Sequence, residues 1–378
     1  MRKYTPILLP IVLFALLFAA FPGCKPELLS PSRYSDSTIV AGSDSAGFAN
    51  GTGTAARFNH PFGLTVDKAG NLYVADQGND LIRMITPGGV VSTYAGTVGI
   101  IGFTNGAATL ARFNKAFSVA ADTSGNIYVA DGGNNVIRLI TPSGTVSNFA
   151  GSGVAGAADG TDTATFNSPL GVATDKAGNV YVADYGNDLI RKINQAGAVS
   201  TIAGKTGVAG AADGLDTAAR FNLPESLAVD ASGNIYVADN GNNLIRKITP
   251  AGMVSTLAGN GKAGFADGTG AAASFNSPFG IAVDGAGNIY VADSGNNRIR
   301  KITPAGAVST FAGSSAKGAH DATGGAATFN TPSGVCVDMA GNVWVADENN
   351  NLIRKITTAG TVSTIASMPA KGIYKLIR

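Results

Sequence analysis

Residues 278–302 read PFGIAVDGAGNIYVADSGNNRIRKI, and this stretch decides the fold of the chain. It contains two short apolar runs, at 280–283 and 289–292, and a third run at 298–302 in which two isoleucines stand among Arg and Lys. Segments rich in Asp, Gly, Asn and Ser separate the three runs. Such runs between turn residues are typical of β-strands. The Asp-Gly-Ala-Gly-Asn segment suits a tight hairpin turn, because glycine accepts a positive φ. The stretch therefore predicts antiparallel strands joined by short turns.

The same pattern recurs along most of the chain. Copies begin with a Phe-Asn pair and start 53 to 55 residues apart, at Phe58, Phe113, Phe166, Phe221, Phe275 and Phe329. Each copy predicts four strands, named a to d, which in the first copy are Gly63–Val66, Leu72–Ala75, Leu81–Ile85 and Val91–Tyr94. No helical periodicity accompanies them. Six such units predict an all-β protein, a six-bladed β-propeller with four antiparallel strands per blade, whose closed ring avoids exposed sheet edges.

Three recurring elements carry a family resemblance: P-x-G-[LIV]-A-V-D, G-N-[LIV]-Y-V-A-D and N-x-x-I-R-K-I. In these elements the chain resembles NHL-repeat proteins over residues 38–366. The resemblance implies a propeller of NHL-like repeats. It does not imply one activity, because similar propellers act as substrate readers, sensor ectodomains, lyases and lactonases. Function therefore has to be argued from the site.

Two segments qualify as strand d of the last blade. Thr38-Ile39-Val40-Ala41-Gly42 matches this strand and is followed by a normal d-to-a connector. Thr361-Val362-Ser363-Thr364-Ile365-Ala366 matches it as well. We expect the N-terminal segment to join the last blade and close the ring. The alternative is a local hairpin at the C-terminus, with residues 38–42 packed outside.

The first residues predict export. Arg2 and Lys3 precede an apolar run from Ile7 to Phe21, which is short for a membrane span and suits a signal-peptide core. The run leads into Pro22-Gly23-Cys24, which resembles a bacterial lipobox. We therefore expect a signal peptide over 1–23, a lipid on Cys24 with a tether over 24–37, the propeller over 38–366 and a tail over 367–378.

This interpretation implies a bacterial lipoprotein of the cell envelope, held at the outer membrane or cell surface through its lipid alone. The alternatives are an ordinary secretory signal with an incidental cysteine, and an uncleaved membrane anchor.

The composition excludes several classes of protein. Hydrophobic residues make up 45% of the chain and charged residues 14%, which excludes a disordered chain. A net charge of +2 excludes a strongly basic nucleic-acid binder. Two cysteines and two histidines exclude a disulfide scaffold and a histidine-rich metal centre. The G-x-G-x-x-G matches at 151–156 and 259–264 are not followed by a helix, so we expect no dinucleotide cofactor. The sequence has no H-E-x-x-H motif, EF-hand loop or zinc spacing of Cys pairs, so we expect no metal, and we predict no other cofactor.

Acidic and basic residues recur at fixed places in each copy. An aspartate ends strand b, and an arginine stands in strand c. If Asp76 pairs with Leu81 across the hairpin, Asp76 and Arg83 lie diagonally on the same sheet face. We expect structural ion pairs, because a catalytic residue is needed once and these recur in every blade. The alternative is a ring of metal-binding carboxylates. The pairs are Asp76–Arg83, Asp131–Arg138, Asp184–Arg191, Asp239–Arg246, Asp293–Arg300 and Asp347–Arg354.

Positions that break the repeat are the best candidates for a ligand site. Three variable positions lie close to strands a and b, on the face where the b-to-c loops and the long d-to-a connectors meet. They predict a site at the mouth of the central channel. The alternative is neutral variation of exposed loop residues. The residues that stand out are His60, Phe62, Lys115, Tyr185, Glu225 and Glu348.

We therefore expect a monomeric, lipid-anchored propeller that serves as a rigid binding platform for a protein or glycan on this loop face. We expect no catalytic residues and no nucleic-acid partner. One alternative is a propeller enzyme, a lyase or lactone hydrolase with a metal-assisted site that starts from His60 and Glu225. Another is a structural component of the cell envelope.

Overall fold

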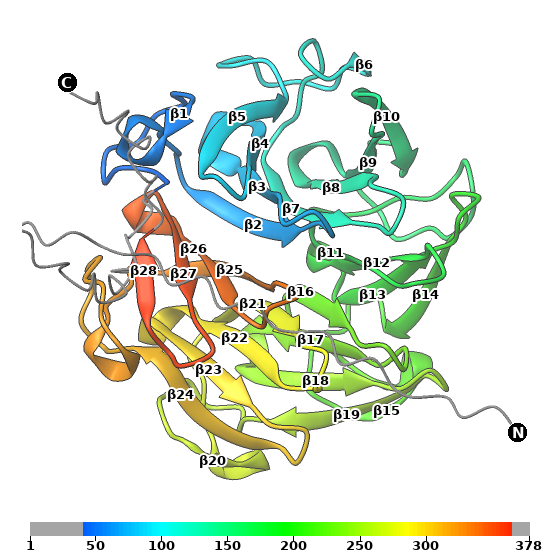
Figure 1. Ribbon diagram of the computed structural model, residues 1–378. Coiled ribbons are helices and arrows are strands. Elements are labelled where there is room, and N and C mark those ends of the chain that lie inside the picture. Colours follow the sequence, from blue (N-terminus) through cyan, green and yellow to red (C-terminus); the bar gives the residue numbers. More distant parts are fainter. Residues whose placement is uncertain (1–40, 365–378) are drawn as a thin grey trace, which may run out of the picture. The chain divides into compact units, whose positions relative to one another are not determined.

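The computed structural model describes residues 41–364, which form six β-sheets around a central axis (Figure 1). Each sheet contains four consecutive antiparallel strands, with strand a nearest the axis and strand d outermost. The sequence-based prediction of an all-β, six-bladed propeller is confirmed. The expected signal peptide, Cys24, the tether and the C-terminal tail lie outside the described residues.

The strands follow the repeat closely. Blades one to three contain β2 Pro61–Val66, β3 Leu72–Asp76, β4 Leu81–Ile85, β5 Val90–Ala95; β7 Ala116–Ala121, β8 Ile127–Asp131, β9 Val136–Ile140, β10 Thr145–Ala150; and β11 Pro169–Thr174, β12 Val180–Asp184, β13 Leu189–Ile193, β14 Val199–Gly204. Blades four to six contain β16 Pro224–Val229, β17 Ile235–Asp239, β18 Leu244–Ile248, β19 Met253–Ala258; β21 Pro278–Val283, β22 Ile289–Asp293, β23 Arg298–Ile302, β24 Ala307–Gly313; and β25 Pro332–Val337, β26 Val343–Asp347, β27 Leu352–Ile356, β28 Val362–Thr364.

Four blades carry a fifth strand that the repeat did not predict. In these four blades the d-to-a connector passes the outer edge of the blade that it enters and pairs two residues with strand d. Blades three and six have a single bridge at this place, Gly160 to Val199 and Thr323 to Thr361. The connectors thus cover the outer edges, where free backbone groups would invite pairing with another chain. The added strands are β1 Gly51–Thr52, β6 Gly106–Ala107, β15 Gly214–Leu215 and β20 Gly268–Thr269.

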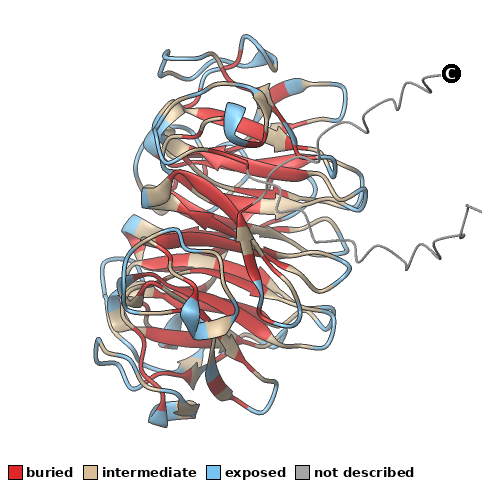
Figure 2. Cartoon of the chain, turned by 60° about the vertical axis from the view of Figure 1, so that its left-hand side comes forward, coloured by how far each residue is buried: buried red, intermediate tan, exposed pale blue. Residues whose placement is uncertain are grey.

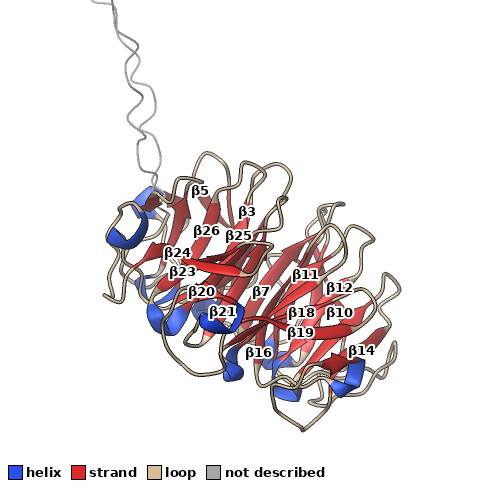
Figure 3. Ribbon diagram, turned by 90° about the horizontal axis from the view of Figure 1, so that it is seen from below, coloured by secondary structure: helices blue, strands red, loops and turns tan. Residues whose placement is uncertain are grey.

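Short 3-10 turns occur in two sets of loops, and they are drawn in blue in Figure 3. One set joins strand b to strand c: η2 Gln77–Asn79, η3 Gly132–Asn134, η4 Tyr185–Asn187, η6 Asn240–Asn242, η8 Ser294–Asn296 and η10 Glu348–Asn350. The other set lies in the connectors: η1 Gly53–Ala55, η5 Asp216–Ala218, η7 Gly270–Ala272 and η9 Gly324–Ala326. No helix among residues 41–364 is long and apolar enough to cross a membrane.

The core lies between neighbouring blades, as the buried strands in Figure 2 show. One cluster packs Tyr73 and Ala75 of blade one against Val119 and Val129 of blade two. Its counterpart between blades six and one contains Val74 and Ile353. Because each blade buries apolar side chains on both faces, no blade can be left out without exposing two apolar surfaces.

The ring closes through a composite strand, which differs from both expectations. At the C-terminus β28 pairs with β27 over Val362–Thr364, as in a local hairpin. Further along β27, Ile353 pairs with Ala41 from the other end of the described chain. The corresponding pair in blade four is Ile245 with Ala258, both from one blade. The two ends of the chain therefore supply successive parts of one strand d. Residues 38–40 and 365–366 lie outside the described residues.

Candidate ligand-binding site at the channel mouth

A ring of hydrogen bonds holds the loop face together. The residue before each strand a has a left-handed backbone, with φ between 49° and 54°. Its N–H donates to the Asp or Asn side chain that ends the 3-10 turn of the preceding blade; for example, Lys115 N lies 2.6 Å from Asp80 Oδ1. The bond between His60 N and Asn351 Oδ1, 3.0 Å, closes this ring between blades six and one. These bonds fix the backbone at the mouth, including that of His60 and Lys115.

The recurrent aspartates and arginines lie inside the blades, away from the mouth pocket. Asp76 and Arg83 are fully buried, with Arg83 Nη1 2.8 Å from Asp76 Oδ2, and all six pairs have N–O distances of 2.7–2.9 Å. Asp76 also accepts bonds from Asn59 N and Asn79 Nδ2. Burial raises the pKa of Asp76 to about 6, against the opposing effect of Arg83. Both carboxylate oxygens of Asp76 are therefore occupied within the blade and are not available to a ligand. This geometry supports a structural role for the pairs.

The other guanidinium nitrogen of each arginine reaches a connector, and sequence reasoning missed this partner. Arg246 Nη2 lies 2.7 Å from Asp213 Oδ1. The signal was the Asn-Gly or Asp-Gly turn that recurs in five of the six connectors, with Asp321-Ala322 in the last one. The equivalent residues are Asn50, Asn105, Asp159, Asp213, Asp267 and Asp321.

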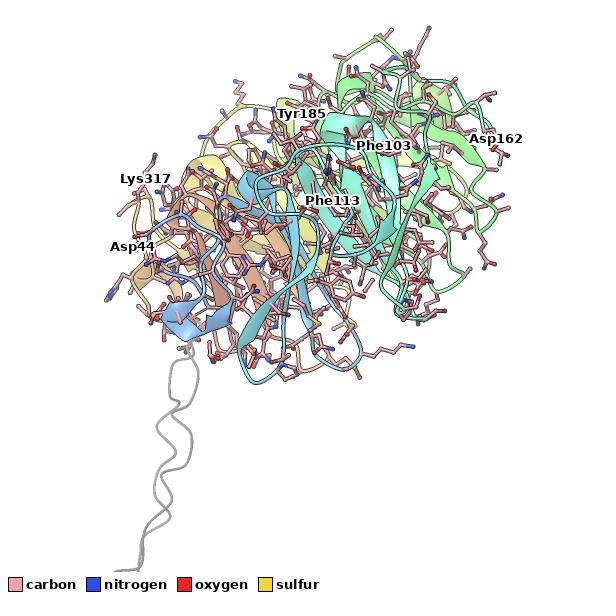
Figure 4. The ribbon with its side chains drawn as sticks, turned by 90° about the horizontal axis from the view of Figure 1, so that it is seen from above. Asp44, Phe103, Phe113, Asp162, Tyr185 and Lys317 are labelled. Atoms are coloured by element: carbon pink, nitrogen blue, oxygen red, sulfur yellow. The ribbon has the colours of Figure 1, made fainter. Side chains whose placement is uncertain are left out.

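A pocket of about 510 Å³ opens on the loop face. Five blades line it, and four of the six sequence-predicted residues are in its wall: Phe62, Lys115, Tyr185 and Glu225. Figure 4 labels Tyr185, the first residue of η4, together with the connector residues Asp44, Phe103 and Lys317. The remaining wall residues include Phe117, Leu170, Asn240 and Phe279. All four belong to the variable positions that the sequence comparison considered, but they were not selected as site residues.

Aromatic rings form one side of the pocket. The rings of Phe62 and Phe117 meet edge to face, with centroids 5.3 Å apart. Phe62 also contacts Phe279 of blade five, at 5.9 Å. Since these residues come from blades one, two and five, the rings reach across the mouth of the channel. Phe62 and Phe279 line both the pocket and the small space below it.

Below these rings the strands a approach one another too closely for larger side chains. A Cβ on Gly63 would lie 2.7 Å from the carbonyl oxygen of Phe117. This crowding is consistent with the small residues at this position, which is glycine in four blades and serine (Ser118 and Ser226) in two. A space of only about 20 Å³ remains at this level, room for about one water molecule. Beyond it, a channel of about 190 Å³ is lined by the strands a of all six blades, whose larger apolar side chains there include Leu64, Val119, Val172, Leu227, Ile281 and Val335. Cys336, a free and buried cysteine, also lines this channel, and burial raises the pKa of its thiol.

Glu225 is the buried acid of the pocket, with 7% of its surface exposed. It replaces the apolar or small residues that the other blades place at this position of strand a. Burial, together with the negative charge of Glu348, raises the pKa of Glu225 to about 8. Tyr185 stands beside it, and burial and the charge of Glu225 raise the pKa of Tyr185.

His60 and Glu348 form a separate pair on the side of blade one. His60 Nδ1 lies 3.5 Å from Glu348 Oε1, and the imidazole is about half exposed. Burial raises the pKa of Glu348, and His60 opposes this shift. The ionic partner of His60 is therefore Glu348, whereas the enzyme alternative started from His60 and Glu225. Among residues 41–364, no group of three or more His, Cys, Asp or Glu side chains is arranged to hold a metal ion.

Comparison with known proteins agrees with this architecture. The family model of the NHL repeat matches residues 166–193, 221–248, 275–302 and 329–356, which lie in blades three to six. The protein SUPPRESSOR OF QUENCHING 1, chloroplastic, of Arabidopsis thaliana is 31% identical over 281 residues, which are 70% of this chain and 27% of that protein. NHL repeat-containing protein 2 of Bos taurus is 28% identical over 337 residues, 78% of this chain and 46% of that protein.

The chain thus spans less than half the length of these two curated relatives. Among solved structures, an auxiliary nutrient binding protein from Bacteroides thetaiotaomicron superimposes with a TM-score of 0.64 and 17% identity, covering 84% of this chain and 75% of that one. At this identity the likeness shows a common fold alone. The matched repeats, the NHL-repeat relatives and the six blades together identify the chain as an NHL-repeat β-propeller protein.

Proposed function

We propose that this propeller is a binding module that receives a protruding group of a protein or glycan ligand in the pocket of the loop face. The observation that carries the proposal is the pocket itself, about 510 Å³ in volume and lined by five blades. Pockets of this size, with mostly apolar walls and a few polar groups, are typical of ligand sites. The similar structure from Bacteroides thetaiotaomicron is named an auxiliary nutrient binding protein, which is compatible with binding as the common role.

The rigidity of the site supports recognition of a preformed group. The six hydrogen bonds of the loop-face ring connect each blade to the next one, and the buried Asp–Arg pairs hold the strands beneath them. A rigid pocket loses little conformational entropy when a ligand binds. The long connectors around it can add contacts for the rest of a larger ligand.

Two variants test the pocket. Labelled protein is applied to a glycan array and to a peptide array, as wild type, Tyr185→Ala and Gln77→Ala. Gln77 has the position of Tyr185 in blade one and does not line the pocket. We expect Tyr185→Ala to weaken binding of any hit about tenfold or more, because an aromatic wall is lost, and Gln77→Ala to leave it unchanged. Equal binding by all three proteins would show that the ligand binds outside this pocket.

We also propose that the protein is exported and anchored through a lipid on Cys24, the cysteine that follows the apolar segment. Replacement Cys24→Ser should abolish incorporation of labelled fatty acid and release the protein from membranes, while leaving the propeller folded. Membrane retention of this variant would point to an uncleaved anchor.

A further inference from the structure

The pocket contains a buried acid that has no partner of its own. No hydrogen bond within residues 41–364 offsets the burial of the Glu225 carboxyl group, and its one charged influence is Glu348, another acid. The contrast with Asp239 in the same blade is large, because that buried acid accepts bonds from Asn222, Asn242 and Arg246. Buried polar groups without partners are costly. A group that enters the pocket and pairs with Glu225 would remove this cost.

The walls around Glu225 define what that group can be. Phe62, Phe117, Phe279 and Tyr185 line the same pocket, and Glu225 belongs to blade four, opposite Phe62 of blade one. Aromatic faces attract cations, most of all cations that are weakly hydrated, such as alkylated ammonium ions. An anion would meet Glu225 and the nearby Glu348, while a neutral group would leave the carboxyl without a counter-ion. Carboxyl and rings together therefore favour an organic cation.

Lys115 is the one positive side chain in the wall, and it does not oppose this assignment. Lys115 is exposed at the rim of the pocket, and its backbone N–H donates to Asp80 in the hydrogen-bond ring of the loop face. Its ammonium group carries no ion pair among the described residues, so the flexible side chain is free to turn toward solvent when a cation enters.

We propose that the pocket binds an ammonium group of its ligand, with Glu225 as counter-ion and with Phe62, Phe117, Phe279 and Tyr185 as aromatic walls. This inference rests on the proposed binding function and adds the chemical class of the group that is bound. The ammonium group can belong to an amino sugar or to an alkylamine such as a lysine side chain, which share this chemistry.

The electrostatics of the pocket give the proposal a second readout. With its pKa raised to about 8, Glu225 is mostly protonated at pH 7 in the empty pocket. A bound cation favours the carboxylate, so binding should release a proton. The groups that face or adjoin it are Glu348 with His60, Tyr185, and Lys115 at the rim. Affinity should then rise with pH up to about 8, with a limiting slope of about tenfold per pH unit below that value.

The experiment compares ligands that differ only in charge. Choline and its neutral isostere 3,3-dimethylbutan-1-ol are titrated into the full chain by calorimetry at pH 6, 7 and 8. Glucosamine with glucose, and butylamine with butanol, form the two further pairs that separate the sources of the ammonium group. We expect at least one cation to bind about tenfold more tightly than its neutral partner. Equal affinities within all three pairs, or no binding of any cation, would overturn the inference.

Variants assign the effect to its residue. Glu225→Gln should remove the preference for the cation and the proton release, while Glu348→Gln, a neighbouring acid outside the pocket wall, should retain both. Tyr185→Ala should weaken the binding of the cations more than the binding of the neutral partners. This second variant keeps the test valid if the Glu225 variant folds poorly. A preference for cations that survives Glu225→Gln in a folded protein would overturn the assignment. A glycan or peptide hit on the arrays without any preference for ammonium would leave the binding function standing and remove this inference.

Discussion

At the scale of single residues, the buried Asp–Arg pairs carry much of the cohesion within a blade. In blade four, Arg246 joins Asp239 to Asp213 of the connector and to the carbonyl oxygens of Arg220 and Ala212. The guanidinium also lies over the ring of Phe221, 5.2 Å from its centroid. One side chain therefore connects strands b and c, the connector and the Phe that opens the repeat.

Loss of one aspartate should leave a buried arginine without its counter-ion. We expect Asp239→Ala to lower the free energy of unfolding by about 3–5 kcal/mol, as is typical when one partner of a buried pair is removed. The measurement is urea unfolding followed by circular dichroism. Asp162→Ala, at an exposed connector position, is the control and should change stability by less than about 0.5 kcal/mol. Unchanged stability of Asp239→Ala with loss of ligand binding would mean that this aspartate belongs to a site.

Repetition decides which single residues could be interpreted from the sequence alone. The Asp–Arg pairs could be inferred because they occur in every blade, so that repetition separates them from chance. Glu225 occurs once, and its burial against Phe62 and Phe279 depends on blades that are far apart in the sequence. Its departure from the repeat marked it as unusual, but only the fold brings the acid and the aromatic rings together.

At the scale of elements, strand bounds follow the repeat to within one or two residues, because turn residues fix both ends. The expected strand Gly63–Val66 is β2, Pro61–Val66, and the expected Leu81–Ile85 has the same bounds in β4. The short outer strands, such as β1, were not predictable in this way. They have two residues each, and they pair because the connector crosses the blade edge, which no local pattern records.

The composite strand of blade six depends on Gly42. This residue has φ +111°, and a Cβ there would lie 2.6 Å from the carbonyl oxygen of Asn351. Gly96, at the corresponding place after strand d of blade one, has φ +109°. We expect Gly42→Ala to destabilise the propeller by about 1–3 kcal/mol or more, from backbone strain and from the clash with blade six.

Gly99→Ala is the matched control. Gly99 also has a positive φ, +71°, but a Cβ there meets nothing within 4 Å. Thermal unfolding of both variants separates strain from contact, so the Gly42 variant should have the lower Tm. Equal shifts in Tm would mean that the contact between the chain ends contributes nothing measurable.

At the scale of the whole molecule, stability comes from contacts between blades that recur all around the ring. The cluster between blades three and four contains Tyr181, Ile190, Leu227 and Val237, and similar clusters lie at the other five junctions. The number of blades was predictable because it equals the number of repeats. How the ring closes was not predictable, because two segments of nearly the same sequence compete for one position in blade six.

A cut between blades three and four tests whether the ring is one cooperative unit. Division of the chain after Gly204 separates the cluster of Tyr181 and Leu227, and each fragment also loses its partner at the junction of blades six and one, where Val74 packs near Ile353. We expect residues 1–204 and 205–378 to be insoluble when produced alone, because each exposes two apolar blade faces. When the two fragments are produced together, they should assemble into a soluble complex that has the far-ultraviolet circular dichroism spectrum of the intact chain. A fragment that is soluble and folds cooperatively by itself would show that a half ring is stable, and that closure through Ala41 and β28 is not required for folding.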